Sequence, residues 1–161
     1  MQIYHLMSIA PTEYHFEIIH EPTQELREAI NGELREFNRI ANPVFWTEYE
    51  KPENEARPLD IFVFDQRHHV IGGLFAETQF LWLKCSIMSV QKEFRRSGIG
   101  TQLMAMAEAE AVRRGCKYGF VDTMEYQAPQ FYLKLGYRIA GQLHDWDSHG
   151  HSKFFLTKEL T

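Results

Sequence analysis

A glycine-containing turn between an apolar segment and an amphipathic helix is the feature that most constrains this chain. The turn is Arg95-Arg96-Ser97-Gly98-Ile99-Gly100, and it follows a β-rich segment that ends at Val90. Ile99, Leu103 and Met106 then fall on one helical stripe. The first N–H groups of a helix have no internal acceptors, and glycine lets the backbone approach an anion closely. With the helix dipole and two arginines, the turn is suited to a phosphate or pyrophosphate group.

Three interpretations of this turn compete. A P-loop requires Lys directly after its second glycine, but Thr101 follows Gly100. A dinucleotide-binding fingerprint requires a third small residue where Leu103 stands, and it belongs near the start of a βαβ unit rather than after four strands. An ordinary glycine turn without a ligand stays open on the motif alone.

The order of expected elements indicates the fold class. We expect a strand over 14–20, a helix over 23–40 with Thr23 as its N-cap, and a long loop over 44–58 that can hold a short helix. Strands follow over 59–65, 70–77 and 81–90, then the helix ending at Arg113-Arg114-Gly115. A strand over 118–123, a helix over 128–135 and strands over 137–143 and 153–158 complete the chain. This order predicts an α/β fold with helices on a mixed sheet, as a single domain over 1–161.

Composition narrows the class of protein. Hydrophobic residues make up 44% of the 161, which predicts one packed core. No segment approaches the roughly 20 apolar residues of a membrane span, and the N-terminus lacks the features of a signal peptide, so we expect a cytoplasmic protein without a membrane partner. Cys85 and Cys116 lie in apolar runs and are expected to be buried thiols. A net charge of -5 argues against a nucleic-acid partner and leaves a cationic small molecule or basic peptide as a partner.

The segment from Val90 to Gly100 resembles the signature of the GNAT superfamily of N-acetyltransferases, in which Arg/Gln-x-x-Gly-x-Gly/Ala cradles the pyrophosphate of coenzyme A. The resemblance continues over residues 128–137, APQFYLKLGY, in the order typical of the family. It covers residues 59–160, and 14–58 by element order. It implies a GNAT-like, mostly antiparallel mixed sheet with a splayed parallel strand pair and helices on both faces. The implied activity is transfer of an acetyl group from acetyl-CoA to a primary amine.

Carried over position by position, the resemblance assigns a role to several residues. The backbone of Met88 and Val90 would pair with the pantetheine arm, and an N–H near Met88 would polarise the thioester carbonyl. Tyr132 would donate a proton to the departing thiolate. The pyrophosphate would be contacted by Arg95, Arg96, Ser97, Gly98, Gly100 and Thr101. Glu125 stands where many relatives carry an Asn that faces the cofactor. No metal ion is expected in the site.

The general base and the acceptor stay open at the level of sequence. Glu77, Glu125, His151 or a water chain could remove the proton from the amine. The acceptor is expected to be a small-molecule or peptide amine. The acids of the loop 44–60, with Asp145 and Asp147, favour a cationic acceptor, although they also fit a solvated surface. A non-catalytic acyl-CoA-binding module is the alternative function, and a homodimer is an option by analogy with the family.

Overall fold

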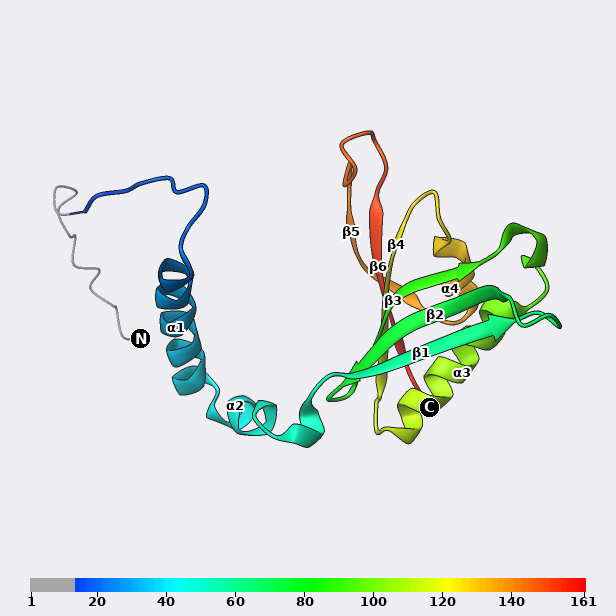
Figure 1. The fold of residues 1–161 in the computed structure, drawn as a ribbon, viewed down its shortest axis with the longest axis horizontal. Coiled ribbons are helices and arrows are strands. Elements are labelled where there is room, and N and C mark those ends of the chain that lie inside the picture. Colours follow the sequence, from blue (N-terminus) through cyan, green and yellow to red (C-terminus); the bar gives the residue numbers. More distant parts are fainter. Residues whose placement is uncertain (1–13) are drawn as a thin grey trace, which may run out of the picture. The chain divides into compact units, whose positions relative to one another are not determined.

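The computed structural model describes residues 14–161, and these residues divide into two compact units between residues 47 and 48. In the first unit, helix α1 (Gln24–Ala41) confirms the expected helix (Figure 1). The Thr23 hydroxyl caps it by accepting the Leu26 N–H at 3.3 Å. Its apolar stripe is exposed: Leu26, Ile30, Leu34, Phe37 and Ile40 lie between 47% and 74% accessible. Helix α2 (Pro43–Tyr49) and a 3-10 turn (Pro52–Asn54) occupy the expected loop.

The strand expected over 14–20 is wrong. Residues 14–19 have no regular structure, and the apolar side chains that suggested a strand, such as Phe16 and Ile18, are 88% and 84% exposed. A strand needs a neighbour to accept and donate its backbone hydrogen bonds. Within residues 14–161 no strand pairs with this segment. Alternation of apolar residues is therefore not sufficient to form a strand over 14–20, because no neighbouring strand among the described residues pairs with it.

The second unit is built on a six-stranded mixed sheet with the order β1-β2-β3-β4-β6-β5. Its strands are β1 (Arg57–Phe64), β2 (Val70–Gln79), β3 (Trp82–Val90), β4 (Tyr118–Met124), β5 (Arg138–Leu143) and β6 (Lys153–Glu159). All neighbouring pairs are antiparallel except β3 and β4, which are parallel. The α/β class, the mostly antiparallel sheet and its parallel pair are confirmed. The single domain over 1–161 stays a prediction.

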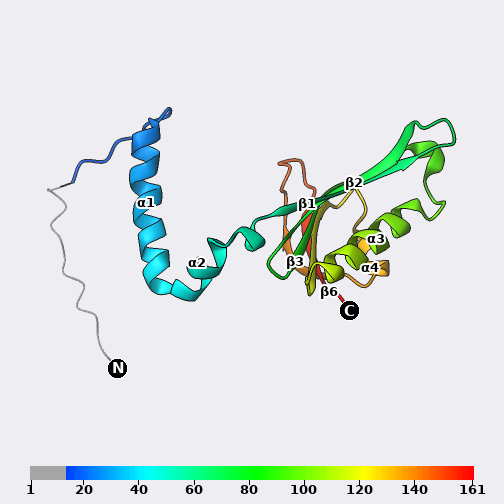
Figure 2. The same ribbon diagram turned by 60° about the horizontal axis from the view of Figure 1, so that its bottom comes forward.

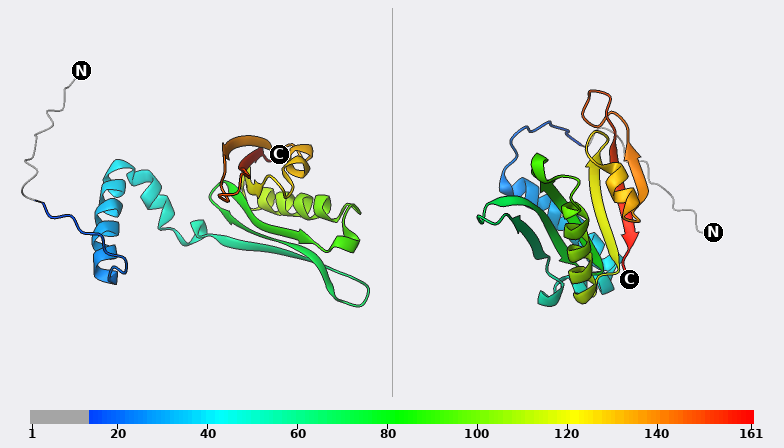
Figure 3. Two further views of the ribbon diagram at one scale, coloured as in Figure 1. Left: turned by 90° about the horizontal axis from the view of Figure 1, so that it is seen from above. Right: turned by 90° about the vertical axis from the view of Figure 1, so that its right-hand side faces the viewer.

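Two helices of this unit lie on one face of the sheet. Helix α3 (Ile99–Arg113) runs across β1, β2 and β3, and the short helix α4 (Pro129–Lys134) lies beside it (Figures 2 and 3). Ala107 and Ala111 of α3 are fully buried, and such small side chains bring the helix close to the strands. The core beneath them contains Leu74, Leu83 and Leu156 at zero exposure.

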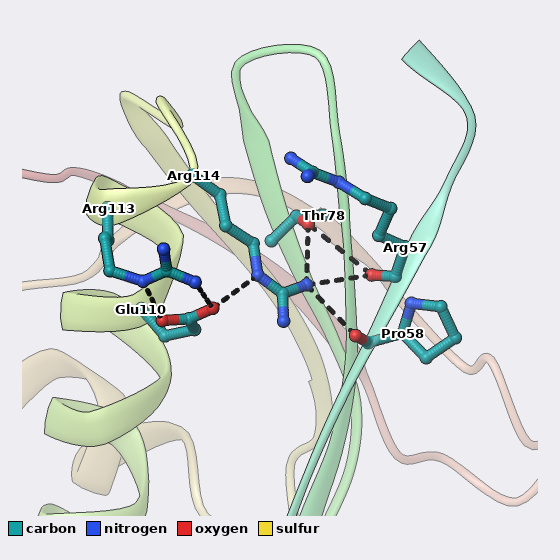
Figure 4. A network of polar contacts seen from close by, with 6 residues as sticks. All are labelled: Arg57, Pro58, Thr78, Glu110, Arg113 and Arg114. Atoms are coloured by element: carbon teal, nitrogen blue, oxygen red, sulfur yellow. Dashed lines mark hydrogen bonds and ion pairs between the residues drawn. The ribbon is translucent and has the colours of Figure 1, made fainter. Parts of the chain in front are cut away.

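The C-terminal end of α3 is fastened to the sheet by Arg114. Its Nε donates to Glu110 at 2.7 Å, and one terminal nitrogen donates to the Pro58 carbonyl at 3.0 Å and to the Thr78 hydroxyl at 3.1 Å (Figure 4). Gly115 follows with a φ of 91°, as expected for a glycine helix cap. The helix therefore has a fixed C-terminal end, and its N-terminal end carries the turn discussed below. In the described part of the chain, no helix is both long and apolar enough to cross a membrane.

Candidate functional site

The parallel strands β3 and β4 separate partway along their length. Their pairing runs from Trp82 opposite Tyr118 to Cys85 opposite Val121 and stops there. At the same point β3 bulges away from β2, because Ser86 has no partner residue on β2. The Ser86 hydroxyl instead donates to the Phe75 carbonyl at 3.0 Å. A bulge bends its strand, so the two distortions together open the sheet, as the expected splayed pair requires.

A cleft of about 250 Å³ lies at this opening. Of the residues predicted from sequence, Met88 and Tyr132 line it. Sequence reasoning missed Cys85, Asp122, Thr123, Gln127 and Ala128, which also line it. The available signal was the position of Asp122 within an otherwise apolar strand, where a carboxylate is uncommon. The cleft combines a phenol, a carboxylate and strand backbone past the end of the parallel pairing.

Tyr132 lies in α4 with only 8% of its surface exposed. Its ring meets Phe131 and Tyr137 edge to face, with centroid distances of 5.1 and 5.9 Å. Burial, and then the neighbouring Cys85 and Asp122, raise the pKa of Tyr132 to about 12. The phenol therefore stays protonated at neutral pH and can act as a hydrogen-bond donor to a group in the cleft.

The glycine turn has the backbone geometry of an anion cradle. Gly98 precedes α3 with a φ of 88°, and Arg96 also has a positive φ of 64°. The first bond into the helix runs from the Gln102 N–H to the Gly98 carbonyl at 3.0 Å. The N–H groups of Ile99, Gly100 and Thr101 precede that bond, so they have no acceptor within the helix. A Cβ on Gly98 would meet nothing within 4 Å, so this side of the turn is open.

Two side chains of the turn are used to build it. The Arg95 Nε–H donates to the Val90 carbonyl at 2.8 Å, and the Ser97 hydroxyl donates to the Phe94 carbonyl at 2.6 Å. Arg95 therefore ties the turn to the end of β3. An arginine side chain carries five N–H donors, and this hydrogen bond uses one of them.

Gly100 links the turn to the cleft. A Cβ at this position would lie 3.4 Å from the Phe131 ring and 3.9 Å from the Met88 methyl group. Phe131 is the neighbour of Tyr132 in α4, and Met88 lines the cleft. The structure thus brings the predicted pyrophosphate turn close to the predicted acid, through contacts with Phe131 and Met88.

The three side chains considered as general bases in the sequence analysis form ion pairs or hydrogen bonds outside the cleft. Glu77 pairs with Lys84 across the hairpin at 3.3 Å, and Glu125 accepts the Ser152 N–H at 3.0 Å. His151 pairs with Asp147 at 2.7 Å. None of these three candidate bases lines the cleft.

The acids of the terminal turn hold that turn together. Asp145 accepts the Gly150 N–H at 2.7 Å, and Asp147 accepts the N–H groups of His149 and His151 at 3.0 and 3.1 Å. Local hydrogen bonds of this kind are typical of Asp in turns. These two of the acids expected to attract a cation therefore have a structural use, and the carboxylate that lines the cleft is that of Asp122.

The two cysteines are buried thiols, as expected. Burial, and then the charge of Glu108, raise the pKa of Cys85 to about 12. A thiol is nucleophilic as its thiolate, so Cys85 is poorly suited to carry an acetyl group although it lines the cleft. Over residues 14–161, no group of three or more His, Cys, Asp and Glu side chains is arranged to hold a metal ion.

Comparison with known proteins gives one consistent result. Residues 57–139 match the family described as the acetyltransferase (GNAT) domain. The chain is 34% identical over 131 residues to a blasticidin-S acetyltransferase of Streptomyces morookaense, covering 79% of this chain and 96% of the relative.

Solved structures agree. An acetyltransferase from Bacillus cereus superposes with a TM-score of 0.71 at 27% identity, covering 89% of this chain and 98% of that one. An aminoglycoside 6'-N-acetyltransferase complexed with coenzyme A shares the fold, with a TM-score of 0.58 at 19% identity over 89% of this chain and 98% of that one. The chain belongs to the GNAT family and is an N-acetyltransferase.

Proposed function

We propose that the protein transfers an acetyl group from acetyl-CoA to a primary amine by direct attack within a ternary complex. The observation that carries this proposal is the proximity of the anion cradle before α3 to the cleft that holds Tyr132, with Gly100 next to Phe131 and Met88. A donor with a pyrophosphate at one end and a thioester at the other needs such an arrangement.

The donor would be bound by backbone and charge together. The pyrophosphate would accept hydrogen bonds from the N–H groups at the start of α3, between Gly98 and Thr101, with Arg95, Arg96 and the Ser97 region alongside. The pantetheine arm would pair with the backbone of Met88 and Val90, where β3 has lost its parallel neighbour. The glycines fit this use because Gly98 leaves the turn open to solvent.

The chemical step forms one N–C bond and breaks one C–S bond. The neutral amine attacks the thioester carbonyl, whose oxygen would be stabilised by a backbone N–H near Met88. Coenzyme A leaves as a thiolate, and the amine nitrogen gives up a proton to water. Because the pKa of Tyr132 is raised to about 12, full transfer of its proton to a thiolate is uphill. Tyr132 therefore contributes chiefly as a hydrogen-bond donor to the sulfur, and the proton released by the amine neutralises the thiolate.

Small amines are the favoured acceptors. The Streptomyces relative is named for blasticidin-S, and a protein of the same fold is named for aminoglycosides. We therefore propose an amine on a small molecule, with a peptide amine as the second class. The homodimer and the cytoplasmic location stay predictions from the sequence.

The decisive experiment incubates the protein with acetyl-CoA and a panel of primary amines while free thiol is measured. Amine-dependent thiol release is expected. Tyr132→Phe should lower kcat by about 10- to 100-fold while coenzyme A affinity stays within about twofold, since a hydrogen bond to a charged group contributes about 1.5–3 kcal/mol. Tyr126→Phe is the matched control, because Tyr126 is 62% exposed on the turn before α4.

Two results would overturn the proposal. Coenzyme A binding without thiol release across the panel would favour the non-catalytic binding module. Equal kcat in wild type and Tyr132→Phe would make Tyr132 a packing residue.

A further inference from the structure

A carboxylate and an ammonium group of the chain itself meet at the cleft. Asp122 lies in β4, directly after the last residue that pairs with β3, and it lines the cleft. Its Oδ2 is 2.6 Å from the Nζ of Lys153 in β6. The side chains are 32% and 21% exposed, so the pair is partly withdrawn from solvent. Asp122 is the single acidic residue among those that line the cleft.

The Lys153 ammonium is held by more than this ion pair. Its Nζ lies 5.0 Å from the ring centroid of Trp146 and 5.7 Å from that of Phe155. Phe155 stands opposite Asp122 in the register of β4 and β6, and Trp146 belongs to the turn before β6. A cation within about 6 Å of an aromatic face is attracted to it. One carboxylate and two rings thus form a site for a primary ammonium group, and the site already holds one.

We infer that this site binds the ammonium group of a cationic acceptor, and that Lys153 fills it when no acceptor is present. The inference rests on the proposed function and names the acceptor class as primary amines that bind as ammonium ions and lose a proton to water before they attack acetyl-CoA. Several of the other acids are engaged elsewhere: Glu77 with Lys84, Glu125 with Ser152, and Asp145 and Asp147 within their own turn. Among residues 14–161, only Asp122 brings a carboxylate to the lining of the cleft.

If Lys153 and the acceptor compete for Asp122, substitutions of the two residues should change the KM for cationic amines in opposite directions. Asp122→Asn removes the charge that binds both ammonium groups, so KM for cationic amines should rise about 10- to 100-fold, the usual effect of a charge-assisted hydrogen bond. Lys153→Met keeps the aliphatic stem but frees the carboxylate, so KM for the same amines should fall about three- to tenfold. The two substitutions act in opposite directions. An ion pair that only supported the fold would make both variants worse.

The experiment measures kcat and KM for matched cationic and neutral amines in wild type, Asp122→Asn, Lys153→Met and Lys153→Arg. Lys153→Arg keeps the positive charge and should stay close to wild type in KM. Glu159→Gln removes the same charge from the far end of β6, and Arg113→Met removes a cation from the end of α3, where its side chain is 73% exposed. Both controls should leave KM unchanged. Calorimetry with coenzyme A and thermal melts on every variant separate donor binding and folding from acceptor binding.

The outcomes distinguish this inference from the proposed function. If wild type acetylates no amine, the proposed function fails. If wild type acetylates amines but KM rises in both Asp122→Asn and Lys153→Met, or changes in neither, the ammonium site is refuted while the enzyme stands. A KM for cationic amines that rises in the first variant and falls in the second supports the inference.

Discussion

The phenol oxygen of Tyr137 occupies the space next to Gly119 that a side chain at position 119 would need. A Cβ built on Gly119 in β4 would stand 2.7 Å from that oxygen and 3.3 Å from the ring carbon that bears it. Tyr137 is only 2% exposed, and its hydroxyl lies near the carboxyl group of Glu108 without a hydrogen bond of good geometry. Burial is the main reason that the pKa of Tyr137 is raised. The absence of a side chain at 119 thus lets the aromatic pair Tyr132 and Tyr137 pack beneath the splayed strands.

Gly119→Ala should destabilise the protein by about 1–3 kcal/mol, the usual cost of overpacking a core. In a Tyr137→Phe background the same change should cost clearly less, because the atom that the new methyl group would strike first is gone. Tyr137→Phe alone should change the free energy of unfolding by at most about 1 kcal/mol, since its hydroxyl approaches Glu108 without a hydrogen bond of good geometry. Urea denaturation of wild type, the two single variants and the double variant gives the coupling free energy between positions 119 and 137. Additive effects would show that the contact does not limit position 119.

Thr101→Glu tests the anion cradle without disturbing the fold. Thr101 is exposed in the first turn of α3, where an acidic side chain stabilises a helix by about 0.3–1 kcal/mol. The same charge would repel a pyrophosphate, so coenzyme A affinity should fall at least about tenfold. Thr101→Gln has almost the same shape without the charge, and should bind within about threefold of wild type. Calorimetry measures both, and unchanged affinity in Thr101→Glu would place the pyrophosphate elsewhere.

Arg96→Gly should separate stability from donor binding. Arg96 has a φ of 64°, a left-handed conformation that costs a non-glycine residue about 1 kcal/mol. Glycine removes that strain, so the melting temperature should rise, while loss of the guanidinium should weaken coenzyme A binding. Arg96→Lys keeps both the strain and the charge and serves as the comparison. If Arg96→Gly bound coenzyme A as tightly as wild type, Arg96 would have no part in holding the pyrophosphate.

Buried thiol and phenol groups predict a loss of stability in alkali. The pKa values of Cys85 and Tyr132 are both raised to about 12 by burial, from ordinary values of 9.0 and 10.0. Between about pH 9 and 12 the unfolded chain releases protons that the folded protein retains, so the free energy of unfolding falls as pH rises. Cys85 alone contributes about 1.4 kcal/mol per pH unit in this window. Denaturation between pH 8 and 11 should show the decline, and Cys85→Ala should make it shallower. An identical slope in both proteins would contradict the assignment to Cys85.

The sequence by itself determined the elements from 57 onward and the turn before α3. Strand alternation, the glycine cap at 115 and the turn at 95–100 are local features, and local chemistry is sufficient to specify them. The family motif also indicated Tyr132 and Met88, and the structure brings both to one cleft.

Only the tertiary structure decided what stands in that cleft. Asp122 and Lys153 lie on different strands, and their contact depends on β6 pairing with β4 in one particular register. In the same register Glu125 accepts a hydrogen bond from the Ser152 N–H, and in the terminal turn Asp147 pairs with His151, so neither carboxylate reaches the cleft. The expected strand at 14–20 failed for a related reason, since pairing requires an edge that periodicity cannot supply. Contacts between distant segments depend on register and closure, which a local pattern of residues does not contain.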